Sequence, residues 1–233
     1  MICEVKPEDI IKYYPHLYHM AESGSWPRIQ RHGLLSTSAL LDLFEINQEK
    51  RHAIESEWRP QSVEIHHPTY GSAVIRDQKP LHEGTLRKLL DGMSAAEYYA
   101  MLNKRTFFWV RRERLEGLLN ARAYRGRAHC VLTVETRALL AKHRDDVWLS
   151  HINSGATFGS GRRGIDTFKR ISQYPFEEMR KKRGENAVVE LAVDYAVKDI
   201  GEFTIRVEDW IGQNPVRTIW QKQENQGLSK LVR

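Results

Sequence analysis

The stretch from His16 to Leu40, HLYHMAESGSWPRIQRHGLLSTSAL, constrains the fold of this chain more than any other segment. Residues Leu17–Met20 within it are typical of a short strand that carries one histidine, His19. Ser25 is placed to cap a helix, and Gly33 is placed to end it. A further serine can cap a second helix directly afterwards. The segment therefore predicts a strand and two helices in close succession, with His19 on the strand.

The rest of the chain mixes short strands and short helices without regular alternation. Arg105–Val110, RTFFWV, joins aromatic and β-branched residues and predicts a buried strand. Ala187–Val193, AVVELAV, is the clearest strand of the last third, and Ser94 opens a capping box with Glu97. Because these strands and helices do not form regular βαβ units, the sequence predicts an α+β fold.

No internal repeat and no linker divides the sequence. At 233 residues, with 41% hydrophobic residues and six tryptophans, the chain can bury a sizeable core. We therefore expect a single domain spanning residues 1–233, with a weakly ordered tail after about residue 214.

The sequence also bears on where the protein acts. No run of about 18 apolar residues is present, so no membrane span is expected. The N-terminus lacks a basic region followed by an apolar one, so we expect no secretion signal. Cys3 and Cys130 are too few for a disulfide framework and are most simply free thiols in a reducing cytoplasm.

Positive charge is concentrated in two segments. The formal net charge is +6, yet Lys104–Arg127 holds eight cationic and two anionic side chains, and Arg162–Arg183 holds eight and three. Such clusters favour a polyanionic partner, either nucleic acid or the pyrophosphate of a nucleotide. The alternative is a solvated basic surface without a partner.

Several familiar site patterns are absent or incomplete. The segment Gly159–Gly164, GSGRRG, matches G-x-G-x-x-G, but no apolar strand leads into it, so a flexible cationic substrate loop is favoured over a dinucleotide-binding turn. His66 and His67 are adjacent and would point to opposite faces of a strand, and no paired cysteine spacing exists, so no metal site is expected. The sequence contains no G-x-S-x-G motif, so a serine hydrolase is not expected.

Two residues are candidates for chemistry, each with an ordinary alternative. His19 lies beside apolar residues, where most histidines are satisfied core or surface side chains. Glu190 interrupts an apolar strand, where glutamate is depleted and costly to bury unpaired. It either points into a cleft or faces solvent on a half-exposed strand. Phe107 and Phe108 are most simply core residues.

Three segments together resemble the ADP-ribosyltransferase fold, especially the DarT-type enzymes that modify DNA. They are LYHMAESGSWPRIQRHGLLS, RTFFWVRRERL and VVELAVDYAVKDI, in the family's order, and they cover about a fifth of the chain. The resemblance implies a core of two small packed, mainly antiparallel sheets with flanking helices. It also implies NAD⁺ as the donor of ADP-ribose, with no metal.

The resemblance also implies roles for individual residues. His19 would hold the ribose on the nicotinamide side, and Phe107 or Phe108 would lie against nicotinamide. Glu190 would bind the ribose 2′-hydroxyl and stabilise the oxocarbenium-like transition state, as a fixed carboxylate can in a dry pocket. Arg105 would contact phosphate or help to activate the acceptor.

The resemblance also implies that backbone amides at Gly33 and Leu34 would approach the nicotinamide amide. Two positions depart from the family. The usual tyrosine of the second motif is replaced by phenylalanine, and Ala21 stands where a hydroxyl residue is commoner.

The segment INSGATFGSGRRGIDTF has no counterpart in the resemblance and is a candidate acceptor-recognition loop. Its side chains Asn153, Arg162 and Arg163 could reach phosphate or base edges.

The function that this resemblance implies is transfer of ADP-ribose from NAD⁺ to nucleic acid, with DNA favoured over RNA. A toxin or phage-defence enzyme with an antitoxin or hydrolase partner fits that activity. Two alternatives remain open. One is an RNA 2′-phosphotransferase of the KptA type, which shares the fold but typically uses an Arg-His-Arg-Arg cluster. The other is a non-enzymatic nucleic-acid-binding module on the same fold.

Overall fold

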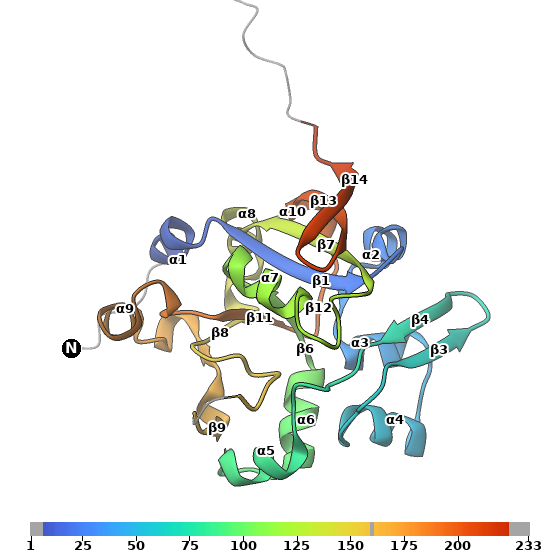
Figure 1. The fold of residues 1–233 in the computed structure, drawn as a ribbon, viewed down its shortest axis with the longest axis horizontal. Coiled ribbons are helices and arrows are strands. Elements are labelled where there is room, and N and C mark those ends of the chain that lie inside the picture. Colours follow the sequence, from blue (N-terminus) through green and yellow to red (C-terminus); the bar gives the residue numbers. More distant parts are fainter. Residues whose placement is uncertain (1–6, 159–160, 224–233) are drawn as a thin grey trace, which may run out of the picture.

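The computed structural model describes residues 7–158 and 161–223. Cys3, Gly159 and Ser160 lie outside the described residues. The α-helices are α1 (Pro7–Tyr13), α2 (Trp26–His32), α3 (Thr37–Leu43), α4 (Gln48–Glu55), α5 (Glu83–Leu89), α6 (Ala95–Asn103), α7 (Arg112–Leu119), α8 (Thr136–His143), α9 (Phe176–Arg183) and α10 (Ile200–Phe203) (Figure 1).

The strands form one large sheet and three two-stranded sheets. The large sheet contains, in spatial order, β10 (Lys169–Arg170), β8 (Val147–Ser150), β11 (Glu190–Asp194), β6 (Arg105–Trp109), β1 (His16–Glu22), β7 (Ala128–Glu135), β13 (Thr204–Ile211) and β14 (Asn214–Gln221). The small sheets pair β2 (Leu34–Leu35) with β12 (Ala196–Val197), β3 (Val63–His67) with β4 (Gly71–Ile75), and β5 (Leu90–Asp91) with β9 (Arg163–Gly164).

The large sheet has a seam between β1 and β6. Every neighbouring pair in this sheet is antiparallel, and β1 pairs with β7 along its whole length. By contrast, β1 and β6 share the single register pair Tyr18↔Trp109. The sheet therefore consists of two four-stranded halves, β10-β8-β11-β6 and β1-β7-β13-β14, which separate from each other along most of the seam.

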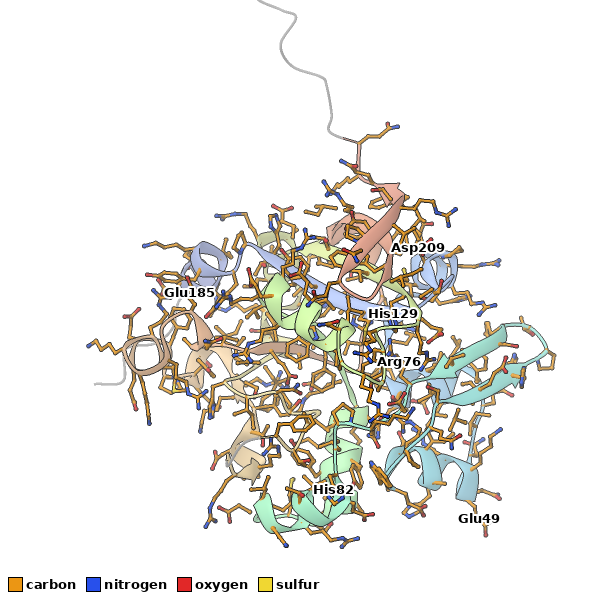
Figure 2. The ribbon with its side chains drawn as sticks, viewed as in Figure 1. Glu49, Arg76, His82, His129, Glu185 and Asp209 are labelled. Atoms are coloured by element: carbon orange, nitrogen blue, oxygen red, sulfur yellow. The ribbon has the colours of Figure 1, made fainter. Side chains whose placement is uncertain are left out.

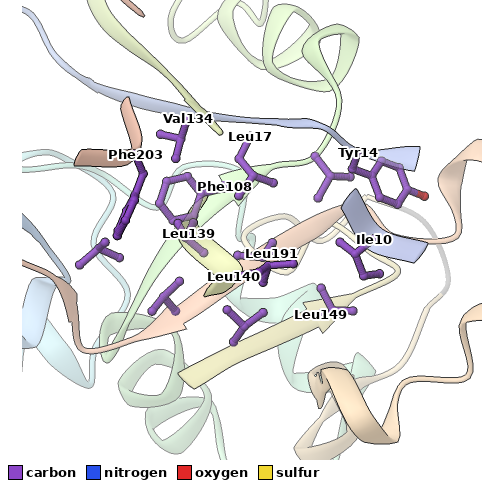
Figure 3. Packing of buried hydrophobic residues seen from close by; sticks show 14 of the residues in the cluster. Ile10, Tyr14, Leu17, Phe108, Val134, Leu139, Leu140, Leu149, Leu191 and Phe203 are labelled. Atoms are coloured by element: carbon purple, nitrogen blue, oxygen red, sulfur yellow. The ribbon is translucent and has the colours of Figure 1, made fainter. Parts of the chain in front are cut away.

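The main core spans both halves of the sheet. Leu17 of β1, Phe108 of β6 and Leu191 of β11 belong to one buried cluster, which α1, α8 and α10 cover. Figure 3 shows these three side chains turned toward the same interior as Leu139 of α8. The shared core holds the two halves together although few hydrogen bonds cross the seam.

The opposite face of the sheet carries separate clusters. Helices α5 and α6 pack over Phe107 and Ala192, and α7 packs over Tyr18 and Trp109. A third cluster joins α3 and α4 to the β3–β4 hairpin, which extends to one side of the molecule (Figure 1). None of the helices in the described part of the chain is long and apolar enough to cross a membrane.

The prediction of an α+β fold with mainly antiparallel sheets and flanking helices is confirmed. The two small sheets that the resemblance implied correspond to the two halves of the large sheet, which stay bonded at one pair. The single-domain organisation stays a prediction.

One local prediction was wrong. The weakly ordered tail expected after about residue 214 begins with β14, which pairs with β13. Trp220 of this strand packs against Trp26, with ring centroids 5.3 Å apart, and this long-range contact stabilises a strand that the local sequence does not indicate. Residues 224–233 lie outside the described residues.

Candidate functional site

A cavity of about 670 Å³ lies at the seam of the large sheet. Its volume falls within the range of about 300–1,000 Å³ that is usual for sites of small molecules. Its walls come from β1, α2, β2, β4, β6 and the loop after β8. The predicted site residues that line it are His19, Gly33, Leu34, Arg105, Phe107, Phe108, Asn153 and Glu190.

Glu190 begins β11 and is 5% exposed. The preceding apolar residues Ala187–Val189 are buried, and Glu190 follows them directly into the interior. The backbone N–H of Ser154 donates to Glu190 Oε2 at 3.0 Å, and the Ser154 hydroxyl donates to the same oxygen at 2.6 Å. Glu190 therefore faces the cavity and not the solvent.

Burial decides the protonation of Glu190. Desolvation raises the pKa of this carboxyl from 4.5 to about 7, against the hydrogen bonds from Ser154 and the charge of Arg163, which both lower it. Near neutral pH both the acid and the carboxylate are therefore populated. A carboxyl with such a pKa can act as an acid, a base or an electrostatic stabiliser.

His19 lies on β1, in the other half of the sheet, and its side chain contacts β6 across the seam. Its Nδ1 lies 2.8 Å from the carbonyl oxygen of Phe107. Because a carbonyl only accepts, Nδ1 carries the proton and Nε2 keeps its lone pair. Desolvation lowers the pKa of His19 to about 4, against the bond to Phe107, and the charge of Arg76 lowers it further. The ring is therefore neutral at pH 7 and offers Nε2 as an acceptor.

Phe107 and Phe108 point to opposite faces of β6. Phe108 is 1% exposed in the main core, and its ring lies 5.8 Å from the His19 ring. Phe107 is half-buried beside Phe168, with ring centroids 6.0 Å apart. The expectation of core residues is confirmed for Phe108. Phe107 is the ring of the two with accessible surface.

Arg105 lines the cavity, but its guanidinium is engaged with neighbouring side chains of the sheet. It pairs with Asp194, with Arg105 Nε 3.2 Å from Asp194 Oδ1, and stacks over the rings of Trp148 at 4.5 Å and Phe168 at 4.8 Å. In the register of β6 and β11, Arg105 faces Asp194 at the end of the strands far from Glu190. Its charge is used within the sheet, which argues against the predicted role in catalysis.

Gly33 ends α2, as the sequence predicts. Its φ is +87°, and an added Cβ would lie 2.5 Å from the Cα of Lys198. Its N–H donates to the carbonyl of Ile29 at 2.8 Å. Leu34 is 4% exposed and pairs with Val197 in the β2–β12 sheet. The Gly33 N–H is thus already occupied within the chain, and the approach of backbone amides of this segment to nicotinamide stays a prediction.

The loop after β8 differs from the flexible acceptor loop that the sequence predicts. Arg162 is outside the cavity lining, is 78% exposed and pairs with Asp91. Arg163 is 3% exposed, and its guanidinium donates to the carbonyls of Gly161 and Ala156. Arg163 therefore supports the loop from inside, which argues against the predicted contact of its side chain with an acceptor.

Within the described part of the GSGRRG motif, Arg163 and Gly164 form the short strand β9, which pairs with β5 in parallel. Gly164 is required there because an added Cβ would lie 2.1 Å from the carbonyl oxygen of Asp91.

Sequence reasoning missed two side chains at the site. Ser154, which holds Glu190, is one small residue in a Gly/Ser-rich loop, and no local pattern distinguishes it. Arg76 lines the cavity, and its Nη1 lies 3.3 Å from Nδ1 of His129, beside which Figure 2 shows it. Among the described residues, no group of three or more His, Cys, Asp or Glu side chains could hold a metal ion.

Comparisons with known proteins give one distant structural relative and one family. The structure titled "Thermosipho africanus DarTG in complex with ADP-ribose" is similar over 83% of this chain and 43% of that chain, with 12% sequence identity and a TM-score of 0.41. This chain thus spans less than half the length of that protein. No curated protein matches the sequence.

A family model described as "Family of unknown function (DUF7002)" matches residues 15–204. This match includes His19, Glu190 and the whole seam between them. The chain belongs to this family.

Proposed function

We propose that this protein is an NAD⁺-dependent ADP-ribosyltransferase, a glycosyltransferase that transfers ADP-ribose to nucleic acid. The observation that carries the proposal is that His19 and Glu190, far apart in the sequence, line one cavity from opposite sides of the sheet seam. The order of the three motifs in the sequence supports the same activity independently.

The chemistry of the two side chains fits cleavage of the bond between nicotinamide and ribose. Neutral His19 presents Nε2 to accept a hydrogen bond from a ribose hydroxyl. Ionised Glu190 would stabilise the positive charge that develops at the ribose C1′. The C1′–N bond breaks with its electron pair on nicotinamide. A nucleophilic nitrogen or oxygen of the acceptor then bonds to C1′ and loses its proton to a base or to water.

The aromatic contact belongs to Phe107 in this proposal. A pyridinium ring is flat and cationic, and it is attracted to the face of an aromatic side chain. Phe107 lines the cavity and retains accessible surface, whereas Phe108 is committed to the core. Phe107 is therefore the residue that we assign to the nicotinamide.

The charge distribution supports a nucleic acid as acceptor. Helix α9 ends in Arg180, Lys181, Lys182 and Arg183, and within the described residues none of these four has a carboxylate at ion-pair distance. Arg183 donates to the carbonyl of His151 at 2.9 Å, three residues before the serine that holds Glu190. This unneutralised charge, joined through Arg183 to the loop that holds Glu190, fits a phosphate backbone. The preference for DNA, a role as a toxin and an antitoxin partner come from the resemblance to DarT-type enzymes.

One experiment tests the proposal directly. The protein is incubated with NAD⁺ labelled in its ADP-ribose part and with separate pools of DNA, RNA and protein. We expect label in DNA, and loss of that label in Glu190→Gln. Glu49→Gln, a change of the same kind at an exposed position of α4, should leave the label unchanged. If no pool acquires label with wild-type protein, the proposal is wrong.

An RNA 2′-phosphotransferase remains the second candidate, because Arg28, Arg59 and Arg76 line the same cavity as His19. Such an enzyme would remove phosphate from an RNA that carries a 2′-phosphate, in the presence of NAD⁺. Full activity of Glu190→Gln on that RNA would favour this candidate over the first.

A further inference from the structure

Ser154, in the loop between β8 and β9, contacts Glu190 directly. Both polar groups of Ser154, the N–H and the hydroxyl, donate to Oε2 of Glu190, at 3.0 and 2.6 Å. The other carboxylate oxygen, Oε1, has no hydrogen-bond partner among the described residues and is not one of the fully buried unpartnered atoms. The two oxygens of this carboxylate are thus in different situations.

The segment that begins at Ser154 is held at three points. Ser154 is 1% exposed, and its carbonyl accepts from the hydroxyl of Tyr98 on α6 at 3.0 Å. Three residues on, the N–H of Thr157 donates to the carbonyl of Pro80 at 3.0 Å. Between them, the carbonyl of Ala156 accepts from the buried guanidinium of Arg163. Residues 154–157 are therefore a firm support, held by contacts with residues distant in the sequence.

We propose that Ser154 is a positioning residue that holds Oε2 of Glu190, so that Oε1 is directed at the donor ribose. This inference rests on the proposed function and assigns to the loop a role that differs from acceptor recognition. Two donors on one oxygen restrict rotation of the carboxylate, and a restricted group is already in place when charge develops on the substrate.

The same two bonds act on the proton of Glu190. Hydrogen bonds that are donated to a carboxylate favour its charged form. Those from Ser154 lower the pKa of Glu190, against the larger effect of burial. Ser154 therefore increases the fraction of Glu190 that is ionised near neutral pH, in addition to orienting it.

The test combines Ser154→Ala with a direct measurement of the carboxyl. The pKa of Glu190 is measured by ¹³C NMR titration of glutamate-labelled protein, with Glu190→Gln to assign the signal. Nicotinamide release from NAD⁺ is measured between pH 5 and 9. For Ser154→Ala we expect the pKa of Glu190 to rise by about one unit, since one charged hydrogen bond is lost. We expect kcat at pH 7 to fall about tenfold, the acid limb of the profile to move to higher pH, and KM for NAD⁺ to change less than twofold.

Two further variants keep the outcome unambiguous. Ser172→Ala, at an exposed serine, should match the wild type in every measurement. Tyr98→Phe removes the bond to the Ser154 carbonyl and leaves both Ser154 donors in place, so it should raise the pKa of Glu190 in the same direction by a smaller amount. It takes over the test if Ser154→Ala does not fold.

The inference and the proposed function fail in different ways. A wild-type protein that releases no nicotinamide refutes the proposed function, while the NMR titration still measures the effect of Ser154 on Glu190. An unchanged pKa of Glu190 in Ser154→Ala, or a loss of rate that is equal at every pH, overturns the positioning role.

Discussion

Replacing Glu190 by glutamine should stabilise the protein at alkaline pH, although it removes the proposed catalytic carboxylate. Burial raises the pKa of Glu190 from 4.5 to about 7. The native state therefore binds this proton more tightly than the unfolded state does. As pH rises from 4.5 to 7 the unfolded state ionises first, so the native state loses stability over that window.

The size of this effect follows from the pKa. One pKa unit corresponds to about 1.4 kcal/mol, so the difference between 4.5 and about 7 corresponds to roughly 3 kcal/mol at pH 8. Glutamine has nearly the shape of the protonated acid, does not ionise, and keeps an oxygen that can accept from Ser154. Below pH 4.5 the wild-type side chain is neutral in both states, so its ionisation adds nothing to the difference there.

Urea unfolding of wild type and Glu190→Gln at half-unit steps from pH 5 to pH 8 measures this directly. We expect the variant's advantage to grow with pH and to reach roughly 3 kcal/mol at pH 8. Glu49→Gln, at an exposed position, should show no such growth. A difference that is constant across this range, or a variant less stable than wild type at pH 8, would refute the claim that a buried, destabilised carboxyl lies at this position.

Three other outcomes are expected. In wild type, kcat/KM for nicotinamide release should rise with pH through an apparent pKa of about 7, because Glu190 must be ionised. A value of kcat/KM that is flat from pH 5 to 8 would contradict this role of Glu190. Gly33→Ala should lower the free energy of unfolding by about 2 kcal/mol or more through both its φ of +87° and the clash of its Cβ. Gly24→Ala is the control, because Gly24 has a φ of +76° but an added Cβ there would meet nothing within 4 Å. It should lower the free energy of unfolding by about 1 kcal/mol, through backbone strain alone. If chemical denaturation gives the same loss for both variants, the clash at Gly33 is contradicted. Changing Lys181 and Lys182 together to glutamate should weaken DNA binding and reduce its salt slope by about two or more, with nicotinamide release unchanged. The matched pair Lys50→Glu and Lys88→Glu, also exposed, should have a smaller effect on DNA binding measured by fluorescence anisotropy.

Local signals in the sequence determine where elements begin and end. The capping box of Ser94 and Glu97 opens α6, and Gly33 ends α2, since these signals act between residues a few positions apart. The aromatic run in RTFFWV forms β6. The choice of Glu190 as a candidate also came from the chain alone, because a glutamate is unusual in an apolar strand, whereas the role of His19 came from the resemblance.

Only the tertiary structure decides how those strands meet. The seam between β1 and β6, and therefore the cavity, depends on a shared core formed by residues from both halves of the sheet. Burial, which no local pattern reports, distinguishes a Glu190 inside the cavity from a Glu190 in solvent. The ion pair between Arg105 and Asp194 is likewise a contact between strands that the local sequence does not report. Ser154 becomes important only because folding brings a loop to Glu190. Periodicity and capping encode contacts over a few residues, whereas the energy that positions this site comes from packing between residues far apart in the chain.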